Sequence, residues 1–374
     1  MARDLVKAGH EVIWLAPAME NIRGEIHLPT VNLRLPSPMG WIVTVLVSLF
    51  HHRKALGKID AVFTWSEYDS LALLLYPATK NAQHTFLQGG DSVECETFIA
   101  RNAERLRRRL KSRFMVFYYP TFQRFLGRRI ERVIVQAQFL GKLLRARCPD
   151  ANWTIDVIPG NTRFDDPIED NDPGVEDKIE ALKDGGLTLG VVGQCFYRAK
   201  GWDLFMEAMT LLKGEPGIRA FLIGYGDEAH LIEEAIAEKG LSDNVHFLGR
   251  VGAAFRFMPQ FDVIVAPTRF LDACPTVILE AMATDRMIVG SDIPGHKALL
   301  GDPTLMFKSG DARALADYIL ALRDNEELRE KNRTLVRGRR EVFDFDWEGE
   351  MVRMLEAYGR GERYASENVK PLED

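Results

Sequence analysis

The feature that most constrains the fold is a regular alternation of short β-rich runs and helical stretches in the second half of the chain. We expect strands at residues 187–193, 219–224, 244–249, 262–268 and 287–291. Helical patterns lie between them at residues 202–213, 227–239 and 275–284. Strand–helix alternation at this spacing is typical of a parallel, doubly wound sheet. We therefore expect an α/β fold built on such a sheet.

The first half alternates less regularly, and 374 residues are too many for one ordinary domain. Strands are expected at residues 11–16, 61–65, 83–87, 133–135 and 154–158. Residues 165–186 are rich in Asp, Glu, Pro and Gly, which is typical of a linker between domains.

The start of the chain predicts an incomplete sheet. Residues 3–8 have the pattern of a helix end, which Gly9 closes, and the strand at 11–16 follows. A helix that enters a strand should itself follow a strand in this architecture, and none precedes it. We expect the first sheet to lack an interior strand, or another segment to fill its place.

The net charge of −6 hides a basic segment, residues 101–132, with eleven Arg and Lys against two acids. Aromatic residues interleave with this charge. Most charge runs are solvated helix faces, but the two signals together favour a surface that meets anionic lipid. Overall acidity argues against nucleic acid as a partner.

Membrane-spanning and metal-binding patterns are absent from the sequence. The longest apolar candidate, residues 39–50, falls short of the ~18 residues of a spanning helix. With no secretory signal at the start, a cytoplasmic location is expected, peripheral on the membrane if the basic segment binds lipid. The cysteines show neither disulfide nor metal-ligand spacing and are expected to be free thiols: Cys95, Cys148, Cys195 and Cys274.

The segment from Asp272 to Glu280 carries the strongest chemical signal. Pro275 suits the first turn of a helix, whose free N–H groups and positive dipole end suit a phosphate. Glu280 lies among apolar helix positions, where an unpaired carboxylate is costly. Since helical side chains lean toward the N-terminus, Glu280 can reach a ligand at the helix start and accept from ribose hydroxyls. A salt bridge or a solvent-facing position is the alternative.

Two further loops follow strands, at the sheet edge where ligands bind in such folds. In the first, residues 193–201, Arg198 and Lys200 could neutralise a diphosphate and stabilise it as a leaving group. The second, residues 224–227, is a Gly-rich turn and a weaker signal.

Together these segments resemble glycosyltransferase family 4, a retaining family with the GT-B fold. That family has an acid, seven residues, a Glu and Ala-Met-Ala, which here is Asp272 to Glu280 followed by Ala281-Met282-Ala283. Its Gly-Arg…Lys-Gly loop corresponds to Gly193-Gln194…Lys200-Gly201. The resemblance is strong from residue 193 to 291 and loose before residue 133.

The resemblance implies two Rossmann-like doubly wound domains facing across a cleft. An acceptor domain is expected at residues 1–165, a linker at 166–186 and a donor domain at 187–345. A C-terminal helix in residues 346–374 is expected to cross back to the first domain.

The resemblance also implies the reaction and its residues. The expected function is retaining, metal-independent transfer of a sugar from a UDP- or GDP-linked donor to a glycolipid or polysaccharide acceptor. Glu280 would bind the ribose, Lys200 the phosphates and Asp272 the hydroxyls of the transferred sugar; these three form the catalytic set. The other donor-site candidates are Gly193, Gln194, Arg198, Arg250, Thr276 and Val277, and those on the acceptor side are Gln88 and Asp91. No metal or cofactor is implied.

Three positions depart from the family pattern. Gln194 stands where the family has an arginine, Asp272 where it usually has a glutamate, and Gln88 where a histidine is common. These departures keep open one alternative, a degenerate GT-B module that binds nucleotide or a partner without turnover. A second alternative on the same fold is a GT-B sugar-nucleotide epimerase.

Overall fold

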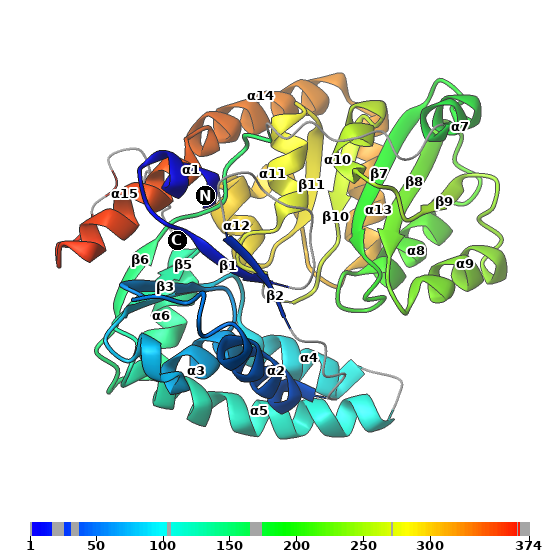
Figure 1. Ribbon diagram of the computed structural model, residues 1–374. Coiled ribbons are helices and arrows are strands. Elements are labelled where there is room, and N and C mark those ends of the chain that lie inside the picture. The colour runs from blue at the N-terminus through cyan, green and yellow to red at the C-terminus, as the bar shows by residue number, and fades with distance from the viewer. Residues whose placement is uncertain are drawn as a thin grey trace. The chain divides into compact units, whose positions relative to one another are not determined.

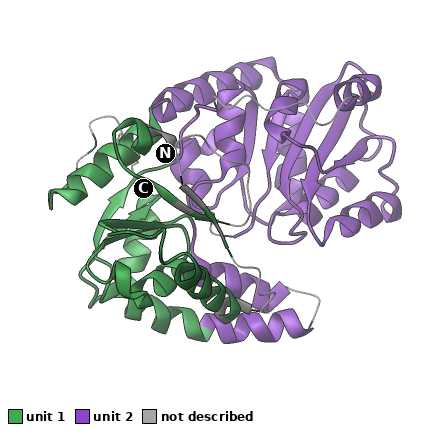
Figure 2. Cartoon of the chain, viewed as in Figure 1, with its two compact units in different colours: residues 1–89, 117–159, 346–370 green, residues 90–116, 160–345, 371–374 purple. Residues whose placement is uncertain are grey.

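The structure, a computed structural model, describes residues 2–16, 26–30, 37–102, 106–164, 174–270, 272–364 and 366. It forms two compact units, shown in Figure 2. The first unit comprises residues 1–89, 117–159 and 346–370, and the second comprises residues 90–116, 160–345 and 371–374. The expected first domain, residues 1–165, differs from this division because residues 90–116 group with the second unit.

The second unit contains a six-stranded parallel sheet in the order β12-β11-β10-β7-β8-β9 (Figure 1). The five strands expected in this half are confirmed as β7 (Leu187–Gln194), β8 (Ile218–Tyr225), β9 (Val245–Gly249), β10 (Val263–Ala266) and β11 (Met287–Ser291). Strand β12 (Met306–Phe307) was not predicted, because it is too short to give a periodic signal.

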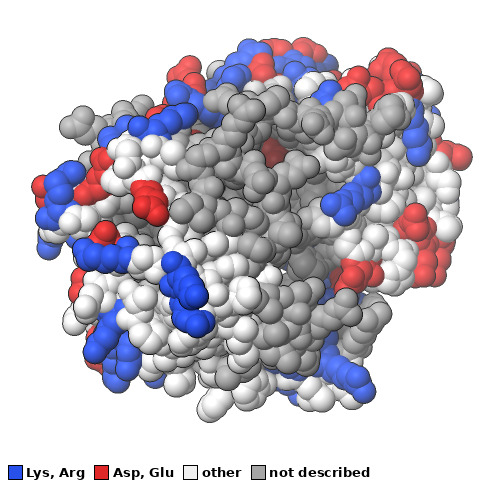
Figure 3. All heavy atoms as spheres, viewed as in Figure 1, with Lys and Arg blue, Asp and Glu red and all other residues white. Residues whose placement is uncertain are grey.

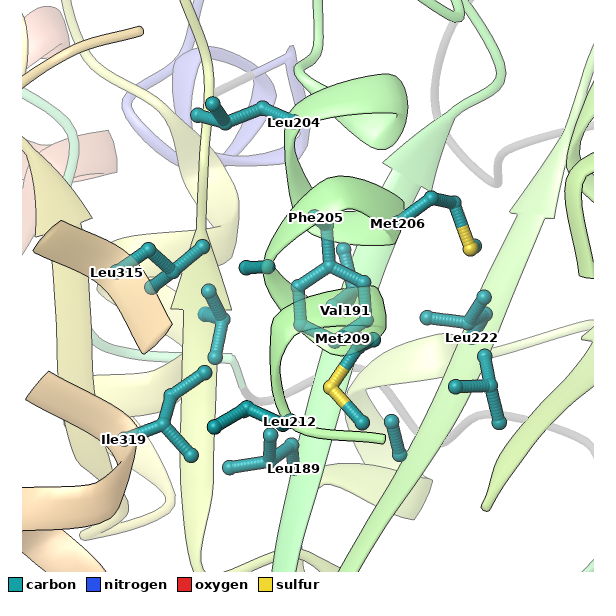
Figure 4. Close-up of a cluster of buried hydrophobic side chains, with 14 of the residues drawn as sticks. Leu189, Val191, Leu204, Phe205, Met206, Met209, Leu212, Leu222, Leu315 and Ile319 are labelled. Atoms are coloured by element: carbon teal, nitrogen blue, oxygen red, sulfur yellow. The ribbon is translucent and has the colours of Figure 1, made fainter. Parts of the chain in front are cut away.

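Helices cover both faces of this sheet. One core cluster contains residues of α8 (Trp202–Leu211), α9 (Ala229–Glu238) and α13 (Ala312–Asp324), and Figure 4 shows its centre. A second cluster contains residues of α11 (Thr276–Ala283), α12 (Pro294–Leu300) and α14 (Glu326–Phe343). Successive residues of β8 alternate between the clusters, Leu222 in the first and Phe221 in the second. This alternation is what a strand buried on both faces requires.

Part of the expected linker is a helix instead. Within residues 166–186, α7 (Val175–Leu182) packs on the second core cluster, and Ile179 is fully buried there. Val175, Ile179 and Leu182 recur at helical spacing, a signal that the acidic composition of the stretch concealed. Residues 165–173 lie outside the described part of the chain.

The first unit contains a four-stranded parallel sheet in the order β3-β4-β5-β6. Its strands are β3 (Ala61–Thr64), β4 (Gln83–Gln88), β5 (Arg132–Val135) and β6 (Thr154–Val157). The expected strand at residues 11–16 is β1 (Ile13–Ala16), which pairs with β2 (Ile26–Pro29) in a separate two-stranded sheet. The expectation that the first sheet lacks an interior strand, or that another segment fills its place, stays a prediction.

The remaining helices are α1 (Ala2–Lys7), α2 (Ser37–His51), α3 (Glu67–Leu75), α4 (Ser92–Asn102), α5 (Leu106–Gly127), α6 (Gln138–Arg147), the short α10 (Ala254–Phe257) and α15 (Trp347–Gly359). Helix α15 belongs to the first unit. Its Tyr358 hydroxyl donates to Asp156 of β6, and the Arg132 guanidinium of β5 lies 3.8 Å from the centre of the Tyr358 ring. These contacts fix the last helix to strands that lie far from it in sequence.

Candidate functional site

The strand order of the second unit creates a topological switch point between β7 and β10. From β7 the chain builds outward through β8 and β9, then returns to the other side of β7 and builds outward through β10, β11 and β12. Loops that leave β7 and β10 therefore turn in opposite directions. In open α/β sheets the crevice at such a point, beyond the carboxyl ends of the strands, is where ligands bind.

Hydrogen bonds lock β7 and β10 together near their beginnings. One carboxylate oxygen of Asp262 accepts from the Thr188 amide at 2.8 Å and from the Thr188 hydroxyl at 2.7 Å. The strands pair at Val263–Leu189 and Ile264–Gly190. This fixed register determines where the loops at the opposite end begin.

Gly201 brings the loop after β7 against the end of β10. Its φ of +75° is a left-handed conformation, and a Cβ there would lie 2.0 Å from the Pro267 carbonyl oxygen. A residue with a side chain would be strained by its backbone and would also clash. Beyond it, the Arg269 amide donates to the Ala199 carbonyl at 3.0 Å. The glycine of the Lys-Gly motif therefore allows the loop after β7 to lie close against the end of β10.

This approach places Lys200 beside Asp272. The Lys200 Nζ and an Asp272 carboxylate oxygen are 2.8 Å apart, and both side chains keep about a fifth of their surface exposed, 23% and 19%. Gly90, from the segment before α4, forms an antiparallel bridge with Asp272. A positive and a negative group thus stand side by side at the switch point.

Helix α11 presents free amides next to this pair. The helix begins at Thr276 after Pro275, and no side chain caps it. The Ile278 amide donates to the Pro275 carbonyl at 3.1 Å, while within the described part of the chain the Thr276 and Val277 amides have no acceptor. Free N–H groups at a helix start, together with the helix dipole, form an anion-binding site.

Glu280 lies one turn further along α11 and is partly buried. Among the described residues its carboxylate has neither a hydrogen-bond donor nor an ion-pair partner. Burial raises the pKa of the Glu280 carboxyl, and no charged group of the described residues counteracts this effect. The salt-bridge alternative is therefore not found within this part of the chain.

The other predicted donor residues lie at neighbouring strand ends. Gln194 ends β7, and its amide lies 3.5 Å from the Tyr225 hydroxyl. The Arg250 guanidinium, after β9, lies 5.3 Å from the centre of the same ring. Arg198 is exposed in the loop after Gly193. Tyr225 was missed by the sequence analysis, although an aromatic residue at the carboxyl end of a buried strand could have indicated it.

The two acceptor-side candidates have different surroundings. Gln88 is buried at the end of β4 in the first unit. Asp91 is buried in the second unit, where its carboxylate accepts from the Val93 amide at 3.0 Å in the first turn of α4. Asp91 thus stabilises a helix start, as acidic residues at that position do.

Charged groups of both signs are interspersed on the face that Figure 3 shows. Over the described residues, no three His, Cys, Asp or Glu side chains are grouped as a metal ion would need. In the same part of the chain, no helix combines the length and apolar character required to cross a membrane. The four cysteines are free, as expected.

Known glycosyltransferases are similar to this chain in the region of the site. The family model "Glycosyl transferases group 1" matches residues 186–325, which include the switch-point loops and α11. Phosphatidyl-myo-inositol mannosyltransferase of Mycolicibacterium smegmatis is 24% identical over 365 residues, 96% of this chain and 87% of the relative. These matches support a family 4-like glycosyltransferase. The predicted resemblance is thus confirmed.

Other relatives match shorter stretches. Phosphatidyl-myo-inositol mannosyltransferase of Mycobacterium leprae is 29% identical over 178 residues, 46% of each chain. The lipopolysaccharide core mannosyltransferase LpsB of Rhizobium meliloti is 32% identical over 164 residues, 40% of this chain and 46% of LpsB. The chain therefore matches these two over about half of their length.

Solved structures confirm the predicted GT-B fold class of this glycosyltransferase. Sucrose-phosphate synthase of Thermosynechococcus elongatus superposes with a TM-score of 0.75 at 19% identity, covering 96% of this chain and 91% of its own. Anabaena HepE, in complex with UDP and glucose, gives a TM-score of 0.64 at 15% identity, covering 90% and 86%.

The close approach at Gly201 generates the first prediction. We expect Gly201→Ala to lower the free energy of unfolding by about 2 kcal/mol or more, since it adds left-handed strain to a clash with Pro267. Urea denaturation measures this. Gly338→Ala is the control, because Gly338 is exposed within α14 with no atom near a Cβ, so this change should be neutral or stabilising. Equal stability of the two variants would contradict the proposed role of Gly201.

Proposed function

We propose that this glycosyltransferase moves a sugar from a UDP- or GDP-linked donor to a glycolipid or polysaccharide acceptor, with retention of configuration and without a metal. The observation that carries the donor site is Glu280, a partly buried carboxylate that has no partner among the described residues. It lies one turn from a helix start whose first two amides have no acceptor among the same residues. A nucleotide supplies complementary groups, ribose hydroxyls for the carboxylate and phosphates for the amides.

Each group at the switch point then has a role. Glu280 accepts from the ribose hydroxyls, and the Thr276 and Val277 amides bind the diphosphate. The positive charges of Lys200 and Arg198 stabilise the phosphates. Asp272, 2.8 Å from Lys200, accepts from hydroxyls of the transferred sugar, so the ion pair lies at the junction of sugar and phosphate. The loop after Gly249 and Arg250 hold the base beside Tyr225.

In the transfer, the bond between the sugar C1 and the phosphate oxygen breaks, and a bond between C1 and the acceptor oxygen forms. Nucleoside diphosphate leaves with the bonding electrons, and the acceptor hydroxyl gives its proton to the departing phosphate oxygen. Negative charge develops on the departing phosphate, where Lys200, Arg198 and the α11 amides stabilise it. Because these groups do the work of a cation, the proposal includes no metal. Retention rests on the family resemblance.

The relatives favour a lipid-type acceptor. Two of them are named for phosphatidyl-myo-inositol and one for the lipopolysaccharide core. Gln194 favours a second candidate, nucleotide binding without turnover, because a neutral amide stands where the family has a guanidinium. Incubation with a panel of UDP- and GDP-sugars separates the two: transfer or hydrolysis supports the enzyme, whereas tight binding with no product supports the binding module.

Helix α5 suggests how a lipid acceptor is reached. Leu106, Leu110, Phe114 and Phe117 lie on one face at helical spacing, and each is more than half exposed, Phe117 by 81%. We define these four residues as the α5 stripe. Basic residues flank it on the same helix: Arg107, Arg109, Lys111 and Arg113. An exposed apolar stripe between cations fits the interface of an anionic membrane.

Nucleotide binding tests the donor site. Hydrogen bonds to a charged acceptor contribute about 1.5–3 kcal/mol, so Glu280→Ala should weaken UDP or GDP binding by roughly one to two orders of magnitude. Lys200→Ala should weaken diphosphate binding but leave uridine or guanosine nearly unaffected, whereas Glu280→Ala should weaken both. Titration calorimetry measures this, with Glu234→Ala, an exposed acid of α9, as control. Normal nucleoside binding by folded Glu280→Ala would refute the ribose contact.

Stability without ligand separates a binding role of Glu280 from a structural one. Its pKa is raised by burial, so its contribution to stability is present at low pH and is lost as the pH rises through that raised value. Glu280→Gln does not titrate. We expect the variant to match the wild type in urea denaturation at acidic pH and to exceed it at neutral pH. A variant less stable at neutral pH would indicate a structural partner for the carboxylate.

The α5 stripe generates a prediction for membranes. Arg107→Glu combined with Arg109→Glu should reduce binding to phosphatidylglycerol vesicles, and wild-type binding should fall as salt rises. Phe117→Ser should reduce binding without changing this salt dependence. Vesicle co-sedimentation measures both, with Arg313→Glu combined with Lys331→Glu, exposed positions of the second unit, as control. Equal sedimentation of all variants would retire the membrane proposal.

A further inference from the structure

A cavity of about 190 Å³ adjoins the donor loop within the second unit. Its walls come from α4, α5, α9 and the loop after β7, and from Phe270 after β10. It shares Gln194, Arg198 and Lys200 with the proposed donor site but no residue of α11 or of the loop after β9. The cavity therefore forms a compartment that meets the donor site at these three residues.

The walls of this compartment are largely apolar. Six apolar side chains from four segments line it: Phe98, Ile99, Phe196, Ala199, Leu231 and Phe270. Phe196 remains 39% exposed although it lies on the wall. Such side chains gain free energy when an apolar group covers them.

Most of the polar groups on the walls are already engaged within the protein. The Arg108 guanidinium pairs with Glu228 at 3.1 Å, and Glu228 also accepts from the Tyr197 amide at 2.7 Å. The Asn102 amide donates to the Phe98 carbonyl at 2.9 Å, and Lys200 pairs with Asp272. A sugar in this compartment would find few free hydrogen-bond partners, whereas an apolar group leaves these bonds intact.

We propose that this compartment binds the apolar part of an amphiphilic acceptor, next to the hydroxyl that receives the sugar. This inference rests on the proposed function and deepens it by assigning a binding site to the apolar part of the acceptor. Helix α5 supports the choice of occupant, because it contributes Arg108 to the wall and carries the α5 stripe along the same helix. The acceptor's apolar part enters from the lipid surface that the stripe contacts.

The test uses the full chain and two probes with one sugar, octyl β-glucoside below its micelle concentration and methyl β-glucoside. Saturation-transfer NMR should detect the octyl compound bound through its chain and little binding of the methyl compound. Ile99→Asn, which makes the wall polar, and Leu231→Trp, which fills the space, should each weaken octyl glucoside binding by roughly tenfold. UDP or GDP affinity should be unchanged in both.

The controls separate this proposal from the donor-site proposal. Leu211→Asn, at an exposed apolar position at the end of α8, should leave octyl glucoside binding unchanged. Glu280→Ala should weaken nucleotide binding but not octyl glucoside binding. Equal binding of the two glucosides, or octyl glucoside binding that neither Ile99→Asn nor Leu231→Trp weakens, would overturn the compartment's role. Absence of any nucleotide binding would instead count against the donor site alone.

Discussion

The position of β7 between β8 and β10 is the constraint on which the rest of the site depends. The Thr188–Asp262 hydrogen bonds fix the register of the two strands at one end. That register fixes where Lys200 and Asp272 emerge at the other end. The chemistry of the site thus follows from sheet topology, since residues 72 positions apart in sequence meet at 2.8 Å.

Several groups at the switch point are stabilised poorly by the protein itself. The carboxylate of Glu280 lacks a partner within the described chain, the first amides of α11 lack acceptors there, and Gly201 has a left-handed backbone. By contrast, the buried amide of Asn332, elsewhere in the second unit, accepts from the Ile288 amide and donates to the Ile288 carbonyl. Local departures from good packing and pairing of this kind are expected where a ligand completes the structure.

Much of this could be predicted from the sequence, and the remainder could not, for physical reasons. Buried parallel strands give continuous apolar runs, so β7–β11 were found, and the spacing from Asp272 to Glu280 identified the donor helix. Helix α7 was missed because a single apolar stripe was enough to bury it within an acidic stretch. Arg108 and Phe98 line one cavity with the donor loop through tertiary packing, which produces no periodic signal in the local sequence.

If the switch point of the second unit holds a nucleotide sugar, a crystal structure of the chain with UDP or GDP will show the nucleotide there. We expect ribose hydroxyls within hydrogen-bond distance of the Glu280 carboxylate and phosphate oxygens at the Thr276 and Val277 amides. A nucleotide bound elsewhere, or one whose ribose faces away from Glu280, would contradict this expectation.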